Sequence, residues 1–288
     1  MRSKLFVPGV RPELFAKALA GEADALSLDL EDSVPESRKD EARANVSAFM
    51  QSAAVVASPK LIVVRVNALG TPHLQADRAA IAHAGVALVN LPKVESAQDV
   101  LAAVAMLEQA EAANGLSQPL RLLATIETPR GLRRAAEIAS AHPRVAGLQL
   151  GLADLFEPFG IDRRDPATVH ATLYAVRMAA AEAGEFAWDA AYADVEDAEG
   201  FRAEAGMARG LGYVCKSCIH PKQVALANAA FMPDAEEIAA ARRIVAAARA
   251  AGNAGRGAFL VDGRMVDLPF LKRAEALVAS VDSNTSPS

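Results

Sequence analysis

The sequence predicts an α/β protein whose core is a (β/α)8 TIM barrel with a C-terminal helical and hairpin extension. Short apolar runs alternate with alanine-rich segments of helical periodicity through most of the 288 residues. Eight such alternations in about 220 residues suit a closed parallel barrel. An open doubly wound sheet is the alternative. No Gly-x-Gly-x-x-Gly fingerprint follows any apolar run, which argues against a dinucleotide-binding version of that sheet.

The expected strands are placed by their apolar runs and by the turn residues that bound them. Between the runs, Ser96 with Asp99 three residues later forms a capping-box pattern ahead of an alanine-rich stretch. Gly210 and Gly212 suit the end of a later helix. The eight expected strands lie within residues 5–9, 25–32, 60–68, 85–94, 121–129, 144–154, 185–190 and 212–221.

The chain continues well beyond the eighth expected strand. We divide it into a catalytic barrel (residues 1–222), a C-terminal extension (223–282) and a disordered tail (283–288). The extension has helical periodicity around Asp262-Gly263, a dipeptide typical of two-residue β-hairpin turns. We expect it to be too small to form an independent domain.

Composition narrows the class of protein. Hydrophobic residues make up 52% and charged residues 23%, as in soluble globular proteins, and the net charge of −5 does not suggest a nucleic-acid-binding surface. No apolar run reaches the roughly 18 residues that a membrane span needs. Pro8 and Gly9 interrupt the first apolar stretch, so we expect no signal peptide and a cytoplasmic location.

The two cysteines, Cys215 and Cys218, rule out a disulfide scaffold. They stand three residues apart on an expected strand, where successive side chains point to opposite faces. We therefore expect them to diverge and to hold no metal between them.

Charged residues close several expected strands at the edge where barrel enzymes have their active sites. Glu127 and Asp154 end two strands that follow one another, and carboxylates this close repel unless a proton or a cation lies between them. Mg²⁺ prefers such oxygen ligands and retains several waters. The alternative is that Glu127 pairs with Arg130 while Asp154 caps the next helix.

Arg65 lies within an apolar run, two residues before Asn67, so we expect the two side chains to share one face of a strand. A buried arginine needs an anionic partner. Either a structural carboxylate or a substrate could supply it, and we favour the substrate because the guanidinium fork suits a carboxylate or a developing enolate oxygen.

Two lysines on expected strands also need an explanation. A lysine in a barrel can form a Schiff base with a carbonyl substrate, and Lys93 stands at a strand end where it could do so. Structural ion pairs are the simpler expectation for Lys93 and Lys216, with Asp29, Glu31 or Asp32 as partners.

Eight segments carry a resemblance to a known family. In order they are RSKLFVPG, LSLDLEDSV, VVRVNALGT, LPKVES, IETPRGL, LGLADL, CIHPKQV and GAFLVDGRMVDLP, spanning about residues 2 to 275. Together they resemble the motifs of the citrate lyase β-subunit-like family of the HpcH/HpaI aldolase superfamily, which includes malyl-CoA and citramalyl-CoA lyases.

The resemblance implies a Mg²⁺ ion at the mouth of a (β/α)8 barrel, with Glu127 and Asp154 as its carboxylate ligands. Arg65 would contact the substrate, and Glu127 would adjoin it. Asp267 would be the catalytic acid that the C-terminal segment carries into an active site, although residue type and position alone indicate only a helix N-cap. In related lyases that segment reaches over a neighbouring subunit, which implies a homotrimer or a multiple of one.

The implied reaction is reversible carbon–carbon cleavage of a 3-hydroxy-3-carboxyacyl thioester, such as malyl-CoA, citramalyl-CoA or a citryl thioester. The products would be an oxo-acid and an acyl thioester, formed through an enolate. A metal-dependent aldolase acting on free hydroxy-oxo acids, a Schiff-base aldolase and a non-catalytic subunit of a citrate lyase-type complex remain as alternatives. The sequence does not choose coenzyme A over an acyl-carrier protein.

Overall fold

A computed structural model describes residues 1–253 and 257–285 of the chain. Its main sheet has eight parallel strands, and every strand lies beside its neighbour in sequence, in the order β7-β6-β5-β4-β3-β2-β1-β8. A parallel bridge between Asp189 and Lys216 joins the two ends of the sheet. This order has no reversal point, so the (β/α)8 barrel is confirmed over the open sheet. The strands are β1 (Ser3–Pro8), β2 (Ala25–Asp29), β3 (Leu61–Arg65), β4 (Leu88–Leu91), β5 (Arg121–Ile126), β6 (Val145–Leu150), β7 (Phe186–Trp188) and β8 (Lys216–Cys218).

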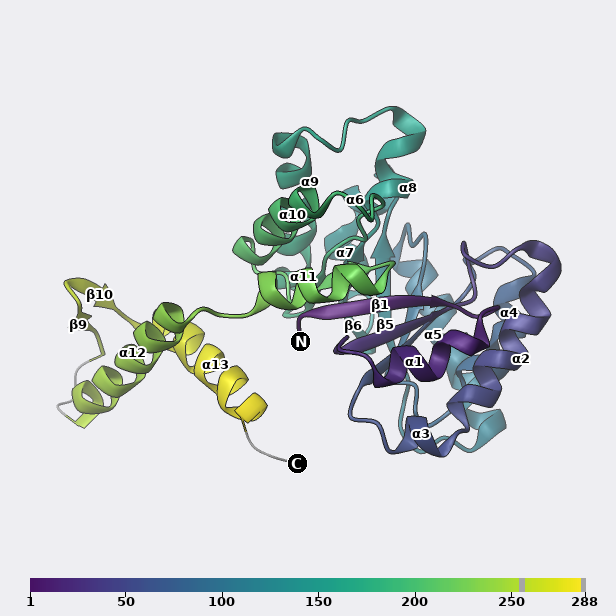
Figure 1. Ribbon diagram of the computed structural model, residues 1–288, viewed down its shortest axis with the longest axis horizontal. Helices are drawn as coiled ribbons and strands as arrows, with labels where there is room; N and C mark the ends of the chain where they lie inside the picture. Colours follow the sequence, from purple (N-terminus) through teal and green to yellow (C-terminus); the bar gives the residue numbers. More distant parts are fainter. Residues whose placement is uncertain (254–256, 286–288) are drawn as a thin grey trace. The chain divides into compact units, whose positions relative to one another are not determined.

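Helices follow the strands along the chain, as the colours of Figure 1 trace. Ser96 caps the longest helix of the barrel by accepting a hydrogen bond from the Asp99 amide, as its capping pattern predicts. Among the described residues, no helix has the length and apolar character needed to cross a membrane. The helices around the barrel are α1 (Phe15–Ala20), α2 (Lys39–Met50), α3 (Ala53–Val56), α4 (His73–Ile81), α5 (Ala97–Asn114), α6 (Pro129–Arg133), α7 (Ala135–Ser140), α8 (Leu152–Phe156), α9 (Pro166–Glu182), α10 (Ala198–Gly210) and α11 (Pro221–Phe231).

The chain divides into two compact units, Met1–Phe231 and Met232–Ser288. The boundary lies nine residues beyond the expected position because α11 packs against β1 and β8 and so belongs to the barrel. The second unit contains α12 (Ala235–Asn253), an antiparallel hairpin of β9 (Phe259–Val261) and β10 (Arg264–Val266), and α13 (Leu268–Thr285).

Two sequence expectations for this second unit have different outcomes. Asp262 and Gly263 form the hairpin turn with φ angles of 49° and 79°, the left-handed conformation that such a turn requires. The disordered tail was expected to begin at residue 283, but α13 extends to Thr285. Residues 286–288 lie outside the described residues.

Apolar side chains fill the barrel in two layers. The larger layer lies between the sheet and the surrounding helices. The smaller one comprises Val63, Leu88, Leu123, Ala146, Trp188 and Cys215. Three of these are followed two residues later, on the same face of the strand, by a polar residue: Val63 by Arg65, Leu88 by Asn90 and Leu123 by Thr125. The barrel interior is therefore polar toward the carboxyl ends of the strands and apolar one layer further in.

The two cysteines fall into different layers, as their spacing predicts. Cys215 belongs to the inner layer and Cys218 to the outer one, and both are free and buried. Burial raises the pKa of each thiol to about 12, which makes both thiols poor nucleophiles.

The prediction for Lys216 is wrong in its partners. The Lys216 ammonium lies 2.7 Å from Asp189 and 2.5 Å from Glu204 of α10, and Arg163 pairs with Glu204 at 2.6 Å. Strand β8 begins at Lys216, and this side chain faces the helical layer rather than the barrel mouth where Asp29, Glu31 and Asp32 lie.

Lys216→Met should lower the free energy of unfolding of the barrel by about 3–5 kcal/mol, because Asp189 would be left buried without its cation. Urea unfolding followed by the fluorescence of Trp188, the single tryptophan, measures this change directly beside the site. The matched control is Lys222→Met, which removes an exposed ion pair with Glu196 and should cost no more than about 1 kcal/mol. Equal midpoints for the two variants would contradict a buried charge cluster.

Candidate active site

An ion pair between Arg65 and Asp29 lies at the carboxyl ends of β3 and β2. The two residues are register partners on neighbouring strands, and the guanidinium binds the carboxylate with two hydrogen bonds of 2.7 Å each. Burial alone would raise the pKa of Asp29, but the adjacent Arg65 charge lowers it to about 2. Both side chains are therefore ionised at neutral pH, and Arg65 has structural carboxylates as partners.

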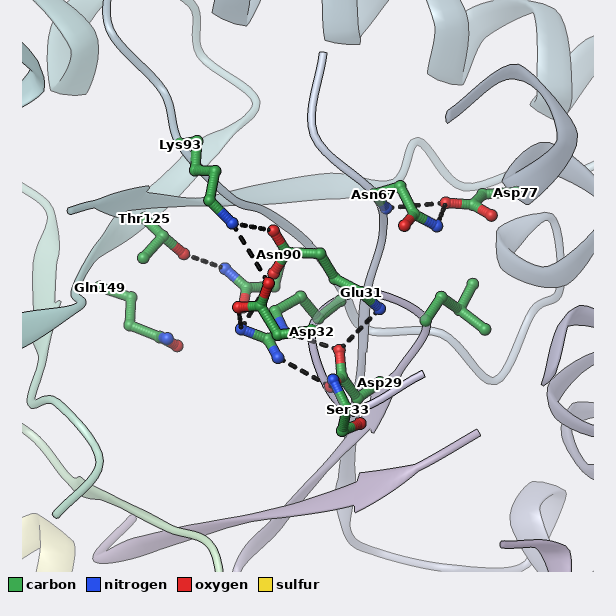
Figure 2. A network of polar contacts seen from close by, with 12 residues as sticks. Asp29, Glu31, Asp32, Ser33, Asn67, Asp77, Asn90, Lys93, Thr125 and Gln149 are labelled. Atoms are coloured by element: carbon green, nitrogen blue, oxygen red, sulfur yellow. Dashed lines mark hydrogen bonds and ion pairs between the residues drawn. The ribbon is translucent and has the colours of Figure 1, made fainter. Parts of the chain in front are cut away.

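The turn after β2 brings two more carboxylates to Arg65. Glu31 lies 3.0 Å and Asp32 3.3 Å from the guanidinium, and both also pair with the ammonium of Lys93, as Figure 2 shows. This confirms the ion pairs expected for Lys93. Burial alone would lower the pKa of Lys93, but the hydrogen bond and charge of Glu31 raise it above its usual value.

The backbone of Lys93 positions Glu127. Lys93 has a φ of 54°, a left-handed conformation that costs energy for a residue with a side chain, and its N–H donates to Glu127 Oε1 at 2.7 Å. The other carboxylate oxygen lies against Gly151, where a Cβ atom would come within 2.4 Å of Glu127 Oε2. Glycine at this position thus gives Glu127 the space it occupies at the end of β5.

The alternative readings of Glu127 and Asp154 do not hold in this structure. Arg130 pairs with Glu95 at 3.1 Å. Asp154 lies in the first turn of α8, but no side-chain hydrogen bond caps that helix, and no described residue forms an ion pair with Asp154. Glu127 therefore has no ion pair with Arg130, and Asp154 does not cap the following helix.

The electrostatics of the barrel mouth suit a cation. Burial, together with the negative charges of Glu31 and Asp154, raises the pKa of Glu127 to about 8. No group of three or more His, Cys, Asp or Glu side chains in the described part of the chain could hold a metal by itself. Two carboxylates with substrate oxygens and water are the donor set that Mg²⁺ takes. The mouth network contains five carboxylates and two cationic side chains: Asp29, Glu31, Asp32, Glu127, Asp154, Arg65 and Lys93.

The expectation that Asn67 shares a face with Arg65 is wrong. Strand β3 ends at Arg65, so the alternation of side chains stops before Asn67. Asn67 instead bonds with its amide and side chain to Asp77 of α4, at 2.7 and 2.9 Å, and accepts from Lys39 of α2 at 2.6 Å, as Figure 2 shows for Asp77. Lys39 also donates to the carbonyls of Leu30 and Glu31, and so holds the turn after β2 in place.

Four polar side chains inside the barrel were not found from the sequence. Asn90 donates to Thr125 Oγ1 at 2.7 Å, and Lys4 donates to Gln149 Oε1. The signal that could have found them is the period-2 alternation, because Lys4, Asn90 and Gln149 all interrupt apolar strands.

Asp267 belongs to the second unit. It directly precedes α13, and its carbonyl accepts a hydrogen bond from the Leu271 amide, as expected at a helix N-cap. Its carboxylate oxygen Oδ1 is buried and accepts no hydrogen bond from any described residue. The side chain therefore has an oxygen without a structural role in the described chain.

Comparison with known proteins agrees with this geometry. Residues 2–221 match the family model described as HpcH/HpaI aldolase/citrate lyase. The chain is 36% identical to the L-malyl-CoA/β-methylmalyl-CoA lyase of Cereibacter sphaeroides, over 98% of this chain and 94% of that protein. It is 37% identical to the citrate lyase subunit β of Escherichia coli, over 98% and 93% of the two chains.

A solved structure is similar to the chain in both fold and sequence. The protein CitE from Mycobacterium tuberculosis, in complex with magnesium, acetoacetate and coenzyme A, is 36% identical with a TM-score of 0.75, covering 98% of each chain. The family model and these relatives each cover most of the sequence. The chain therefore belongs to the HpcH/HpaI aldolase/citrate lyase family, whose members named here are lyases.

Proposed function

We propose that the protein is a Mg²⁺-dependent lyase that cleaves, or forms, a carbon–carbon bond in a 3-hydroxy-3-carboxyacyl-CoA thioester such as malyl-CoA or citramalyl-CoA. The observation that carries this proposal is the pair Glu127 and Asp154 within a barrel mouth that has more carboxylates than cations. The proposal is supported by similarity to a malyl-CoA lyase and to a structure containing magnesium and coenzyme A.

Glu127 and Asp154 would hold the metal. Glu127 is fixed by the Lys93 amide and the space at Gly151, so its carboxylate needs little rearrangement to bind a cation. When bound, Mg²⁺ would supply a positive charge beside the substrate's hydroxyl and carboxylate oxygens, which lowers the pKa of the hydroxyl.

The chain's own residues would then act on the charge that moves during cleavage. The substrate hydroxyl would give its proton to a water at the barrel mouth, the adjacent carbon–carbon bond would break, and its electron pair would move onto the thioester fragment as an enolate. An oxo-acid, glyoxylate or pyruvate, leaves as the other product. Arg65, held by Asp29, is a fixed cation that would stabilise the developing negative charge.

Asp267, starting in its protonated form, would donate its proton to the enolate carbon, which completes the acyl thioester and leaves a carboxylate that takes a new proton from solvent. Its unpaired Oδ1 is compatible with such a role. We also propose that the active protein is a homo-oligomer, a trimer or a multiple of one, in which the C-terminal unit of one subunit serves the barrel of another.

A Schiff-base mechanism through Lys93 is disfavoured by the site. The ammonium pairs with Glu31 and Asp32, and its raised pKa keeps it protonated. A protonated amine does not attack a carbonyl group, so Lys93 would need to lose both a proton and two partners before it could react.

The purified protein should cleave malyl-CoA, citramalyl-CoA or both, and excess EDTA should abolish the reaction, because no described residue forms an ion pair with Glu127 or Asp154 that could replace Mg²⁺ there. Release of free coenzyme A and of the oxo-acid are followed separately, so that thioester hydrolysis is distinguished from carbon–carbon cleavage. Turnover that survives EDTA would overturn the metal-dependent mechanism. Cleavage of neither thioester by folded protein would favour a carrier-protein thioester or a free hydroxy-oxo acid.

Glu127→Gln should lose turnover and Mg²⁺ affinity together while gaining stability at pH 8 without metal. The native pKa of about 8 exceeds the unfolded value of 4.5, so the folded state holds the extra proton between these values. Wild-type stability therefore falls as pH rises through this window, whereas the glutamine variant has no such loss. Thermal unfolding at pH 6 and 8, with and without Mg²⁺, measures both effects.

The control for this experiment is Glu182→Gln, which changes an exposed carboxylate at the end of α9. It should retain the wild-type response to both pH and Mg²⁺. An equal Mg²⁺-induced rise in melting temperature for wild type and Glu127→Gln would remove Glu127 from the metal site.

Asp267→Asn should fold normally but slow turnover by roughly a hundredfold or more, because the enolate would lose its proton donor. Asp262→Asn is the control, since asparagine tolerates the left-handed φ of 49° in the hairpin turn. Full activity in the Asp267 variant would show that another group protonates the enolate.

A further inference from the structure

A buried lysine below the barrel mouth has no role in the proposed mechanism. Lys4, the second residue of β1, is 0% exposed, and its ammonium donates a hydrogen bond to Gln149 Oε1 of β6. The ammonium also lies 4.4 Å from the centre of the Phe6 ring and 5.4 Å from that of Trp188. No carboxylate of the described residues forms an ion pair with it, which is unusual for a buried ammonium.

Lys4 lies close to the site although it does not reach the mouth. Arg65 lies 5.0 Å from the centre of the same Phe6 ring, so one aromatic ring contacts both cations. Thr125 and Gln149 are register partners on β5 and β6, and two residues further along the chain Glu127 and Gly151 lie against each other just past the strand ends. Gln149 therefore lies one inward position below the end of β6, on the floor of the barrel mouth.

The contact with Lys4 fixes the orientation of the Gln149 carboxamide. An ammonium has three hydrogen-bond donors and no acceptor, so only the carboxamide oxygen can face it. The NH₂ group then points away from Lys4, and no described residue accepts a hydrogen bond from it; Figure 2 shows Gln149 beside Thr125 with no contact to the other residues drawn.

We propose that Lys4 is a positioning residue that turns the NH₂ group of Gln149 toward the barrel mouth, where Gln149 donates a hydrogen bond to a carboxylate or keto oxygen of the oxo-acid part of the substrate. An NH₂ donor backed by a buried cation favours an anionic oxygen over a neutral or cationic group. This inference rests on the proposed lyase function, because that function places an oxo-acid at the mouth.

The test compares Lys4→Met, Gln149→Leu and the double variant with the wild type. Each single variant should weaken the binding of pyruvate or glyoxylate, measured by calorimetry with Mg²⁺, by roughly five- to tenfold, the loss expected for one hydrogen bond. With a thioester substrate, KM should rise more than kcat falls. The double variant should be no worse than either single variant, because Lys4 acts through Gln149.

Each outcome distinguishes this inference from the proposed function. If the wild type turns over the thioester and both single variants bind the oxo-acid as tightly as the wild type, the role of Lys4 is overturned and the lyase function stays intact. Weakened oxo-acid binding in the variants without thioester turnover by the wild type supports Lys4 and overturns the lyase function. Additive losses in the double variant, or a wild type that binds neither oxo-acid, overturn the proposed contact.

A stability measurement separates positioning from a merely structural role. Burial lowers the pKa of Lys4 from 10.5 to about 7, with Arg65 acting in the same direction and Cys215, Asp29 and Cys218 opposing it. Below pH 7 the folded state carries a buried charge at full cost, and between about 7 and 10.5 the cost declines, because the folded state has released a proton that the unfolded chain retains.

Lys4→Met should therefore melt at a higher temperature than the wild type at pH 6, and the difference should narrow above pH 7. Lys17→Met, which changes an exposed lysine of α1, is the matched control and should melt with the wild type at every pH. A Lys4→Met protein that melts lower than the wild type at pH 6, or fails to fold, would show that Lys4 is retained for stability and would overturn the inference.

Discussion

The bidentate ion pair between Arg65 and Asp29 is the contact on which the barrel mouth depends. It joins the ends of two neighbouring strands, and Asp29 also accepts from the Glu31 amide in the turn that follows. Glu31 bridges Arg65 to the Lys93 ammonium, and the Lys93 amide holds Glu127. A continuous series of contacts thus runs from β2 to the end of β5. A substitution at Asp29 should therefore alter the position of Glu127, three strands away.

This network leaves the mouth with more carboxylates than cationic side chains. Glu127 is the carboxyl group whose ionisation is most disfavoured as a result. The carboxylate is buried, its neighbours are acidic, and its pKa of about 8 keeps it largely protonated at neutral pH without a cation. A divalent ion would replace that proton and remove the repulsion from Asp154. On the proposed function, the barrel mouth would therefore be more stable with a bound cation than without one, a common trade between stability and function at active sites.

The number and order of the strands could be predicted from the sequence, because apolar runs bounded by turn residues mark them, but several strands end earlier than predicted. Glu127 and Asp154 were chosen as candidate metal ligands because parallel strands end at one rim, and their role stays a prediction. Errors occurred where a strand was shorter than its apolar run: Asn67 lies beyond the end of β3, and Lys216 begins β8 facing the helices. Lys4 was missed because a charged residue at a strand's start normally indicates solvent, and only the closed barrel makes that position interior.

The inner layer of the barrel shows why Lys4 needs a functional explanation. Its neighbours Phe6 and Trp188 are aromatic, and the ring faces recover only part of the lost hydration of an ammonium. A methionine of similar length would fill the same space without that cost. A residue that opposes stability at a position where an apolar one fits is expected at functional sites. Lys4 differs from Lys216 in this respect: Lys216 is equally buried, but two carboxylates neutralise it and its role is complete within the fold.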